Sequence, residues 1–171
     1  MRKRPGERAQ ARQAFEEALG IRRKLAEAEP AAFAPDVATT LNNLGNVLRD
    51  LGERGQARQA YEEALGIYRE LAEAEPAAFA PDVAMTLNNL GNVLSDLGER
   101  AQARQAYEEA LGILLPYARE EPRVFAGRLM MVVRNAVRLL KETGEKPEEW
   151  PALVEAVGVL EGLKEGKEEG A

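Results

Sequence analysis

The chain has 171 residues, a formal net charge of −6 at pH 7, and neither cysteine nor histidine. Without cysteine there are no disulfides and no thiolate chemistry, and without histidine the commonest general base and metal ligand are missing. An acidic chain has few spare cations with which to neutralise phosphates, so we expect no binding to nucleic acid.

The apolar runs of the chain are only a few residues long, far short of the ~20 that a membrane-spanning helix needs. The basic start, Met1 to Pro5, leads into polar residues rather than into the apolar region of a signal peptide. We therefore expect a cytoplasmic protein that does not contact membranes and needs no cofactor or metal ion.

A nearly identical segment, GERxQARQAxEEALGI, begins at Gly6, at Gly52 and again at Gly98, a spacing of 46 residues. A fixed period of this size is typical of a solenoid, in which each repeat is one supersecondary unit stacked on the next. The repeat predicts an all-α, right-handed solenoid of antiparallel helix pairs with about seven helices.

Within the first copy, apolar residues at helical spacing predict a helix over 7–29 and another over 36–51, with a linker over 31–34 between them. Pro30 is expected to end the first helix, because proline lacks the backbone donor that a helix interior needs. Pro35 suits the first position of the next helix, where that donor is not used. We call helices like 7–29 second-type and helices like 36–51 first-type.

Residues 52–97 repeat residues 6–51 with 40 identities in 46 positions. Among the six changes, only the one from Phe15 to Tyr61 falls at a position expected in the core. The third copy drifts after Ile113 but keeps the register of the repeat.

The third unit spans 98–143, with a first-type helix expected over 128–143. A last helix, over 147–163, is expected to cap the stack, because the terminal units of solenoids are atypical. Its expected apolar face consists of Trp150, Leu153, Val154, Val157 and Leu160. The single predicted domain thus covers 1–163, and residues 164–171 are expected to form a charged, flexible tail.

The chain opens with a second-type helix that has no first-type partner. This helix either caps the array or presents a face that pairs with another chain, and a fragment of a longer array would also open in this way.

Glycines inside predicted helices point to close packing. Gly45 and Gly91 lie in first-type helices, and Gly20, Gly66 and Gly112 lie in second-type helices. Glycine costs a helix interior ~1 kcal/mol relative to alanine. We therefore expect close backbone contacts at all five positions, although a recent duplication could also have copied an accident.

The residues at matched positions carry a family resemblance. Leu44-Gly45, Gly52, Ala57, Tyr61 and Ala64 recur as Leu90-Gly91, Gly98, Ala103, Tyr107 and Ala110. This pattern resembles the tetratricopeptide repeat signature. The phrase TLNNLGNVL and the long unit are similar to the kinesin light chain type. The family often has a proline at the place of Arg69, so here the helix is expected to run on to Pro76.

The resemblance implies a protein-interaction adaptor whose first-type helices line a concave groove. Asparagine carries both donors and an acceptor, which suits hydrogen bonds to an extended peptide. The candidate binding residues are Asn42, Asn43, Asn46, Arg49, Asn88, Asn89, Asn92, Arg134, Asn135, Arg138 and Lys141. The alternative is that some of these asparagines brace adjacent turns of the stack.

The last copy adds a basic stripe. Arg134, Arg138 and Lys141 are three or four residues apart and therefore share one side of a helix. We interpret this stripe as holding a carboxylate of the partner, either an acidic side chain or a free C-terminus. The alternative is a solvated charged face paired with neighbouring glutamates.

The sequence argues against an enzyme. The Glu-Glu pairs at 16–17, 62–63 and 108–109 point about 100° apart on a helix, and no nucleophile–base pairing, phosphate-binding loop or metal-ligand spacing is found. The predicted function is to bind a protein or extended peptide. The alternatives are self-association, through the unpaired first helix or the groove, and a recently expanded array without a dedicated ligand.

Overall fold

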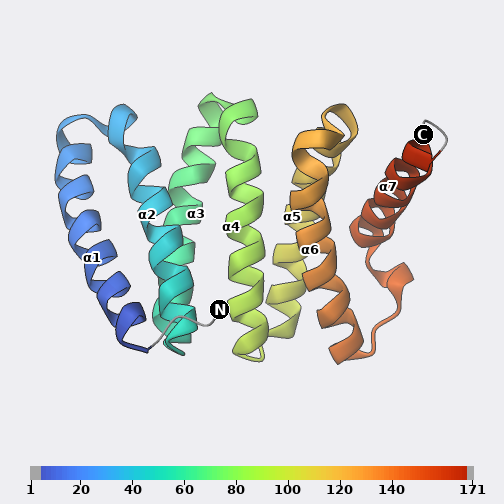
Figure 1. The fold of residues 1–171 in the computed structure, drawn as a ribbon, viewed down its shortest axis with the longest axis horizontal. Coiled ribbons are helices and arrows are strands. Elements are labelled where there is room, and N and C mark those ends of the chain that lie inside the picture. Colours follow the sequence, from blue (N-terminus) through green and yellow to red (C-terminus); the bar gives the residue numbers. More distant parts are fainter. Residues whose placement is uncertain (1–4, 169–171) are drawn as a thin grey trace.

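The computed structural model describes residues 5–168, and the side chains of residues 6–163. Within this range seven α-helices follow one another from one end of the molecule to the other (Figure 1). Their bounds are α1 Pro5–Ala28, α2 Pro30–Asp50, α3 Arg54–Ala74, α4 Pro76–Asp96, α5 Arg100–Glu120, α6 Pro122–Thr143 and α7 Pro151–Glu168. A short 3-10 turn, η1 Pro147–Glu149, precedes α7. The expected all-α solenoid is confirmed.

Consecutive helices pack against each other, and the core lies between the first-type helices α2, α4 and α6 and the second-type helices α1, α3, α5 and α7. Tight turns join α2 to α3 and α4 to α5. At the first turn Gly52 has a φ of 83°, and the amide of Glu53 donates to the carbonyl of Leu48 over 2.9 Å. This is the pattern of a Schellman motif, in which glycine takes up the left-handed conformation without strain.

A glycine–tyrosine contact fixes the distance between the two helices of a pair. A Cβ atom on Gly45 would lie 2.6 Å from Cε1 of Tyr61, and one on Gly91 would lie 2.7 Å from Cε1 of Tyr107. Both tyrosines are fully buried. The close packing expected at Gly45 and Gly91 is thus confirmed, because no other residue leaves room for the ring.

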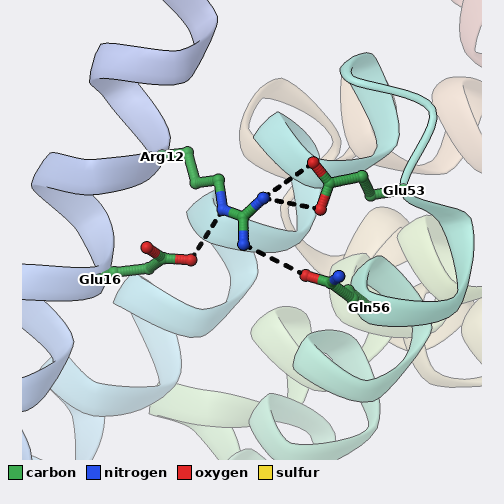
Figure 2. Close-up of polar contacts among 4 residues, drawn as sticks. All are labelled: Arg12, Glu16, Glu53 and Gln56. Atoms are coloured by element: carbon green, nitrogen blue, oxygen red, sulfur yellow. Dashed lines mark hydrogen bonds and ion pairs between the residues drawn. The ribbon is translucent and has the colours of Figure 1, made fainter.

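An ion-pair clamp joins each second-type helix to the turn before the next one. Figure 2 shows Arg12 of α1 donating through Nη1 to both carboxylate oxygens of Glu53 over 2.8 Å, while its Nε donates to Glu16. The same contact recurs between Arg58 and Glu99 at 2.9 Å. These glutamates are at the N-cap positions of α3 and α5 but do not cap the helices with their side chains, since they are bound to the arginines.

The clamp ends at Trp150. This residue stands one repeat after Arg104, and it is fully buried. Its Nε1 donates to Glu145 over 2.6 Å, which also accepts from Arg104 over 2.9 Å, and the Arg104 guanidinium lies 5.0 Å above the indole ring. Trp150 thus takes the place of the next arginine in the series, and it bonds the same glutamate as Arg104 instead of a glutamate of a following unit.

The start of the first-type helices was predicted wrongly. Residues 31–34 are helical, and α2 begins at Pro30 and continues through Pro35. Alanine-rich segments favour helix, and Pro30 already occupies the first helical position, so Pro35 removes only one hydrogen bond. The third copy follows the same rule, and α6 begins at Pro122 rather than at residue 128. As expected, α3 runs on to Ala74, just before Pro76.

The second-type glycines were also misread. A Cβ atom on Gly20, Gly66 or Gly112 would meet nothing within 4 Å, because these positions face outward.

A second core position, besides Tyr61, was not predicted from the sequence. Tyr68 is only 5% exposed and shares a 2.9 Å hydrogen bond with Thr39, whereas Arg22, its counterpart in the first copy, bonds Thr40.

At the C-terminal end, α7 begins at Pro151 and extends to Glu168, so the expected tail starts inside the helix. Lysine and glutamate are good helix formers, which favours this extension. Residues 169–171 lie outside the described range. Trp150, Leu153 and Leu160 are buried as expected, but Val154 is 50% exposed.

The two classes of glycine should respond oppositely to alanine. We expect Gly66→Ala and Gly112→Ala each to raise the free energy of unfolding by up to ~1 kcal/mol through helix propensity alone. Gly45→Ala and Gly91→Ala should lower it by about 1–3 kcal/mol, because the added methyl overlaps a buried ring. Urea unfolding followed by circular dichroism measures all four. Equal effects at the two classes of site would contradict the glycine–tyrosine contact.

Candidate functional site

The asparagines of the first-type helices bond from one unit to the next. Asn42 of α2 donates to Thr86 of α4 over 2.8 Å and accepts from Asn89 over 3.2 Å. Asn135 of α6 donates to Asn88 of α4 over 2.8 Å, and Asn88 is only 1% exposed. These side chains satisfy one another across the stack, so part of their hydrogen-bonding capacity goes to bracing neighbouring units.

A second set of asparagines accepts hydrogen bonds from Tyr61 and Tyr107. We call these the interlocking tyrosines, because their rings pack against Gly45 and Gly91. The Tyr61 hydroxyl donates to Asn46 over 2.8 Å, and the Tyr107 hydroxyl donates to Asn92 over 2.9 Å. Burial raises the pKa of each tyrosine to about 12. For Tyr107, the nearby cations Arg138 and Arg49 act in the opposite direction and lower the pKa. The sequence reading missed these pairs, although tyrosine follows asparagine by fifteen residues in both copies.

A polar hollow of about 370 Å³ opens on the face formed by α2, α4 and α6. We call it the central hollow. Its lining consists of Arg49, Asn88, Asn89, Asn92, Asp96, Met131, Asn135 and Arg138. Arg49 comes from α2 and Arg138 from α6, so two guanidiniums approach one space from either side of α4. At the repeat position of Arg49, α4 carries Ser95.

The two arginines differ in their surroundings. Arg138 donates through Nη2 to Asn92 over 2.9 Å, which fixes its guanidinium at the edge of the hollow. No hydrogen bond or ion pair with any other residue in 6–163 engages the Arg49 side chain. The sequence reading missed Asp96, which places one carboxylate among the two cations.

The basic stripe lines a second hollow, of about 490 Å³, along α6. We call it the lateral hollow. Its lining is Arg134, Val137, Arg138, Lys141 and Glu142. The structure thus brings the predicted stripe together, with Arg138 shared between the two hollows. Of the other candidates, Asn42, Asn43 and Asn46 line neither hollow, and Asn43 is exposed.

Comparison with known sequences identifies the repeat. A sequence profile described as tetratricopeptide repeat matches residues 6–70 and, in a second match, residues 36–115. The chain belongs to the tetratricopeptide repeat family. The closer likeness to the kinesin light chain type stays a prediction.

Other comparisons add little to this assignment. A search of curated proteins finds no match. Among solved structures, the chain is similar to the crystal structure of MamA, with 19% identity, coverage of 99% of this chain and 98% of that chain, and a TM-score of 0.30.

Family membership indicates a protein-interaction scaffold, since tetratricopeptide repeats bind proteins or peptides and are generally not enzymes. Among the described residues, none of the helices combines the length and apolar character required to cross a membrane.

Alkaline pH should destabilise the fold through the interlocking tyrosines. Their folded pKa is about 12, above the ordinary value near 10, so the unfolded chain loses protons first. Stability is therefore complete below pH 10 and falls by about 1.4 kcal/mol per pH unit for each tyrosine as the pH rises toward 12. Unfolding free energies between pH 9 and pH 11.5, with tyrosinate absorbance recorded in parallel, measure this.

The Tyr61→Phe/Tyr107→Phe variant is the control. Phenylalanine already stands at the equivalent position, Phe15, of the first copy. The variant should show a shallower loss of stability with pH and a smaller late phase of tyrosinate absorbance. A residual late phase is expected from Tyr68, because burial raises the pKa of this tyrosine as well. An unchanged slope would assign the alkaline loss of stability to other groups.

Proposed function

We propose that the face formed by α2, α4 and α6 binds an extended polypeptide segment and holds a carboxylate of that segment in the central hollow. The observation that supports this proposal most directly is the pair of guanidiniums, Arg49 and Arg138, at one polar hollow of about 370 Å³. Guanidinium–carboxylate hydrogen bonds are short, directional and roughly twice as strong as neutral ones. The carboxylate is either an acidic side chain or a free C-terminus.

The electrostatics of the hollow favour one added negative charge. Arg49 and Arg138 contribute two positive charges and Asp96 one negative charge, which leaves one cation without a counter-charge. Asparagine side chains around it supply donors for the peptide backbone, insofar as they are not used to brace the stack. Asn92, for example, accepts from Tyr107 and Arg138 through its oxygen, and no residue in 6–163 accepts from its amide nitrogen.

An array of random 12-residue peptides tests this proposal. Half of the peptides should carry a free C-terminus and half a C-terminal amide, at both low and moderate salt. We expect the bound peptides to be enriched in Asp and Glu, or in free C-termini, and their binding to weaken with salt. Arg49→Gln should lower the affinity of the best peptides about tenfold, consistent with losing one charged hydrogen bond.

Arg54→Gln is the matched control, because Arg54 is exposed at the start of α3 and lines neither hollow. This variant should bind like the wild type. If Arg49→Gln and Arg138→Gln bound the selected peptides as tightly as Arg54→Gln does, the central hollow would not hold the carboxylate.

Self-association is a second candidate, and the surface of α1 favours it. Ile21 and Leu25, one helical turn apart, are 62% and 42% exposed. Adjacent exposed apolar side chains often mark an interface. If α1 pairs with a second copy, sedimentation velocity should show a concentration-dependent dimer that Ile21→Ser/Leu25→Ser abolishes. A monomer at all concentrations would rule this candidate out.

A further inference from the structure

One side of α6 is exposed to solvent, whereas the matching side of α4 is buried. The repeat register matches Met130, Arg134, Val137 and Lys141 of α6 to Ala84, Asn88, Gly91 and Ser95 of α4. Ala84 and Asn88 are almost inaccessible, and Asn88 is bonded by Asn135 of α6. On α6, Met130 is 36% exposed, and Arg134 and Lys141 are exposed as well. We call these four residues the open face of α6.

The open face combines apolar and basic character. The lateral hollow of about 490 Å³ runs along it and is lined by Val137, by the three cations Arg134, Arg138 and Lys141, and by one carboxylate, Glu142. Within residues 6–163, the side chains of Arg134 and Lys141 make no hydrogen bond or ion pair. Like charges one helical turn apart repel each other, so a negatively charged neighbour would relieve this repulsion.

An earlier unit of the array shows which kind of helix packs beside a cation at the position of Lys141. Lys141 occupies, two units later, the position of Arg49 on α2. Next to Arg49 packs α4, whose Asp96 lines the same hollow as Arg49. A first-type helix that carries a carboxylate near this position is therefore the neighbour that the repeat places against it.

A second copy of the chain does not fit this position in register. In the array, every first-type helix is preceded by one second-type helix. If α2 of a second copy stacked on α6, then α1 of that copy and α7 of the first copy would have to occupy the same place. In addition, the arginine that clamps successive units is replaced by Trp150, which stands just before α7 and bonds back to Glu145.

We propose that the open face of α6 binds an acidic amphipathic helix of a partner protein, which lies along α6 as α6 lies along α4. Its carboxylates pair with Arg134 and Lys141, and its apolar side packs on Val137 and Met130. The proposal stands independently of the central hollow, because Arg134, Val137 and Lys141 do not line that hollow. Only Arg138 borders both.

Synthetic helices derived from α4 are suitable probes, because α4 is the helix that packs beside Arg49. The acidic probe is the peptide Pro76–Asp96 with Met85→Glu and Asn89→Glu, which together with Asp82 and Asp96 form one acidic stripe. The basic probe carries lysine at these four positions. A third probe adds Leu87→Pro to the acidic peptide and breaks its helix. Fluorescence anisotropy with the full chain measures the affinity of each labelled probe.

For the wild type, we expect the acidic probe to bind at least tenfold more tightly than the basic probe or the proline probe, with an affinity that falls as salt rises. Arg134→Glu/Lys141→Glu should weaken the acidic probe at least tenfold and make the basic probe the better ligand. This exchange also shows that the variant is folded. Arg54→Gln, at an exposed arginine that lines neither hollow, should leave the affinity of the acidic probe within twofold of the wild-type value.

Several outcomes would overturn the proposal. Equal binding of the acidic probe to the wild type and to Arg134→Glu/Lys141→Glu would exclude the open face. Equal binding of the proline probe would exclude a helical ligand. Loss of binding in Arg49→Gln alone would place the acidic probe in the central hollow. A dimer of the wild-type chain that Arg134→Glu/Lys141→Glu abolishes would identify a second copy as the occupant instead.

Discussion

The contact between a glycine of a first-type helix and a tyrosine of the following helix sets the geometry on which the rest of the array depends. At Gly45–Tyr61 and Gly91–Tyr107 the ring comes too close to the glycine to leave room for a Cβ atom, so the two helices pack closely around a large, flat side chain. The tyrosine hydroxyl crosses the pair and donates to an asparagine of the first-type helix. One contact thus determines the helix spacing and also holds a polar side chain on the α2, α4 and α6 face.

In the last helix pair, α6 and α7, both positions of the glycine–tyrosine contact carry other residues. In the register of the repeat, Val137 stands at the position of the glycine and Leu153 at the position of the tyrosine, so the helix residue is larger and its counterpart smaller than in the earlier pairs. Leucine has no hydroxyl, so the asparagine that would accept from it is not needed. Arg138 stands there instead and reaches back to Asn92. In the final unit, Arg138 thus stands where the earlier unit has the asparagine that accepts from tyrosine.

The asparagines that dominate the repeat serve the stack first. Asn42, Asn88, Asn89 and Asn135 bond across units, which leaves the charged residues at the edges of the network as the groups with spare hydrogen-bonding capacity. Arg49 in the first unit, and Arg134 and Lys141 in the last, are such groups. The residues that are identical between copies build the scaffold, and the residues that differ between copies supply the charged groups with spare hydrogen-bonding capacity.

The sequence by itself determined the period, the all-α solenoid, the turn glycines and the side of each first-type helix that carries polar residues, because all of these follow from local spacing. It failed where a choice depended on neighbours in space. A proline could be read as a helix start or as a tolerated interruption, and only packing distinguished Gly45 from Gly66. Burial of Asn88 and Tyr68, the bonds of Trp150 and Arg104 to Glu145, and the placement of Arg49 and Arg138 at one hollow required the tertiary structure. Each depends on residues of different segments that come near one another only when the units stack.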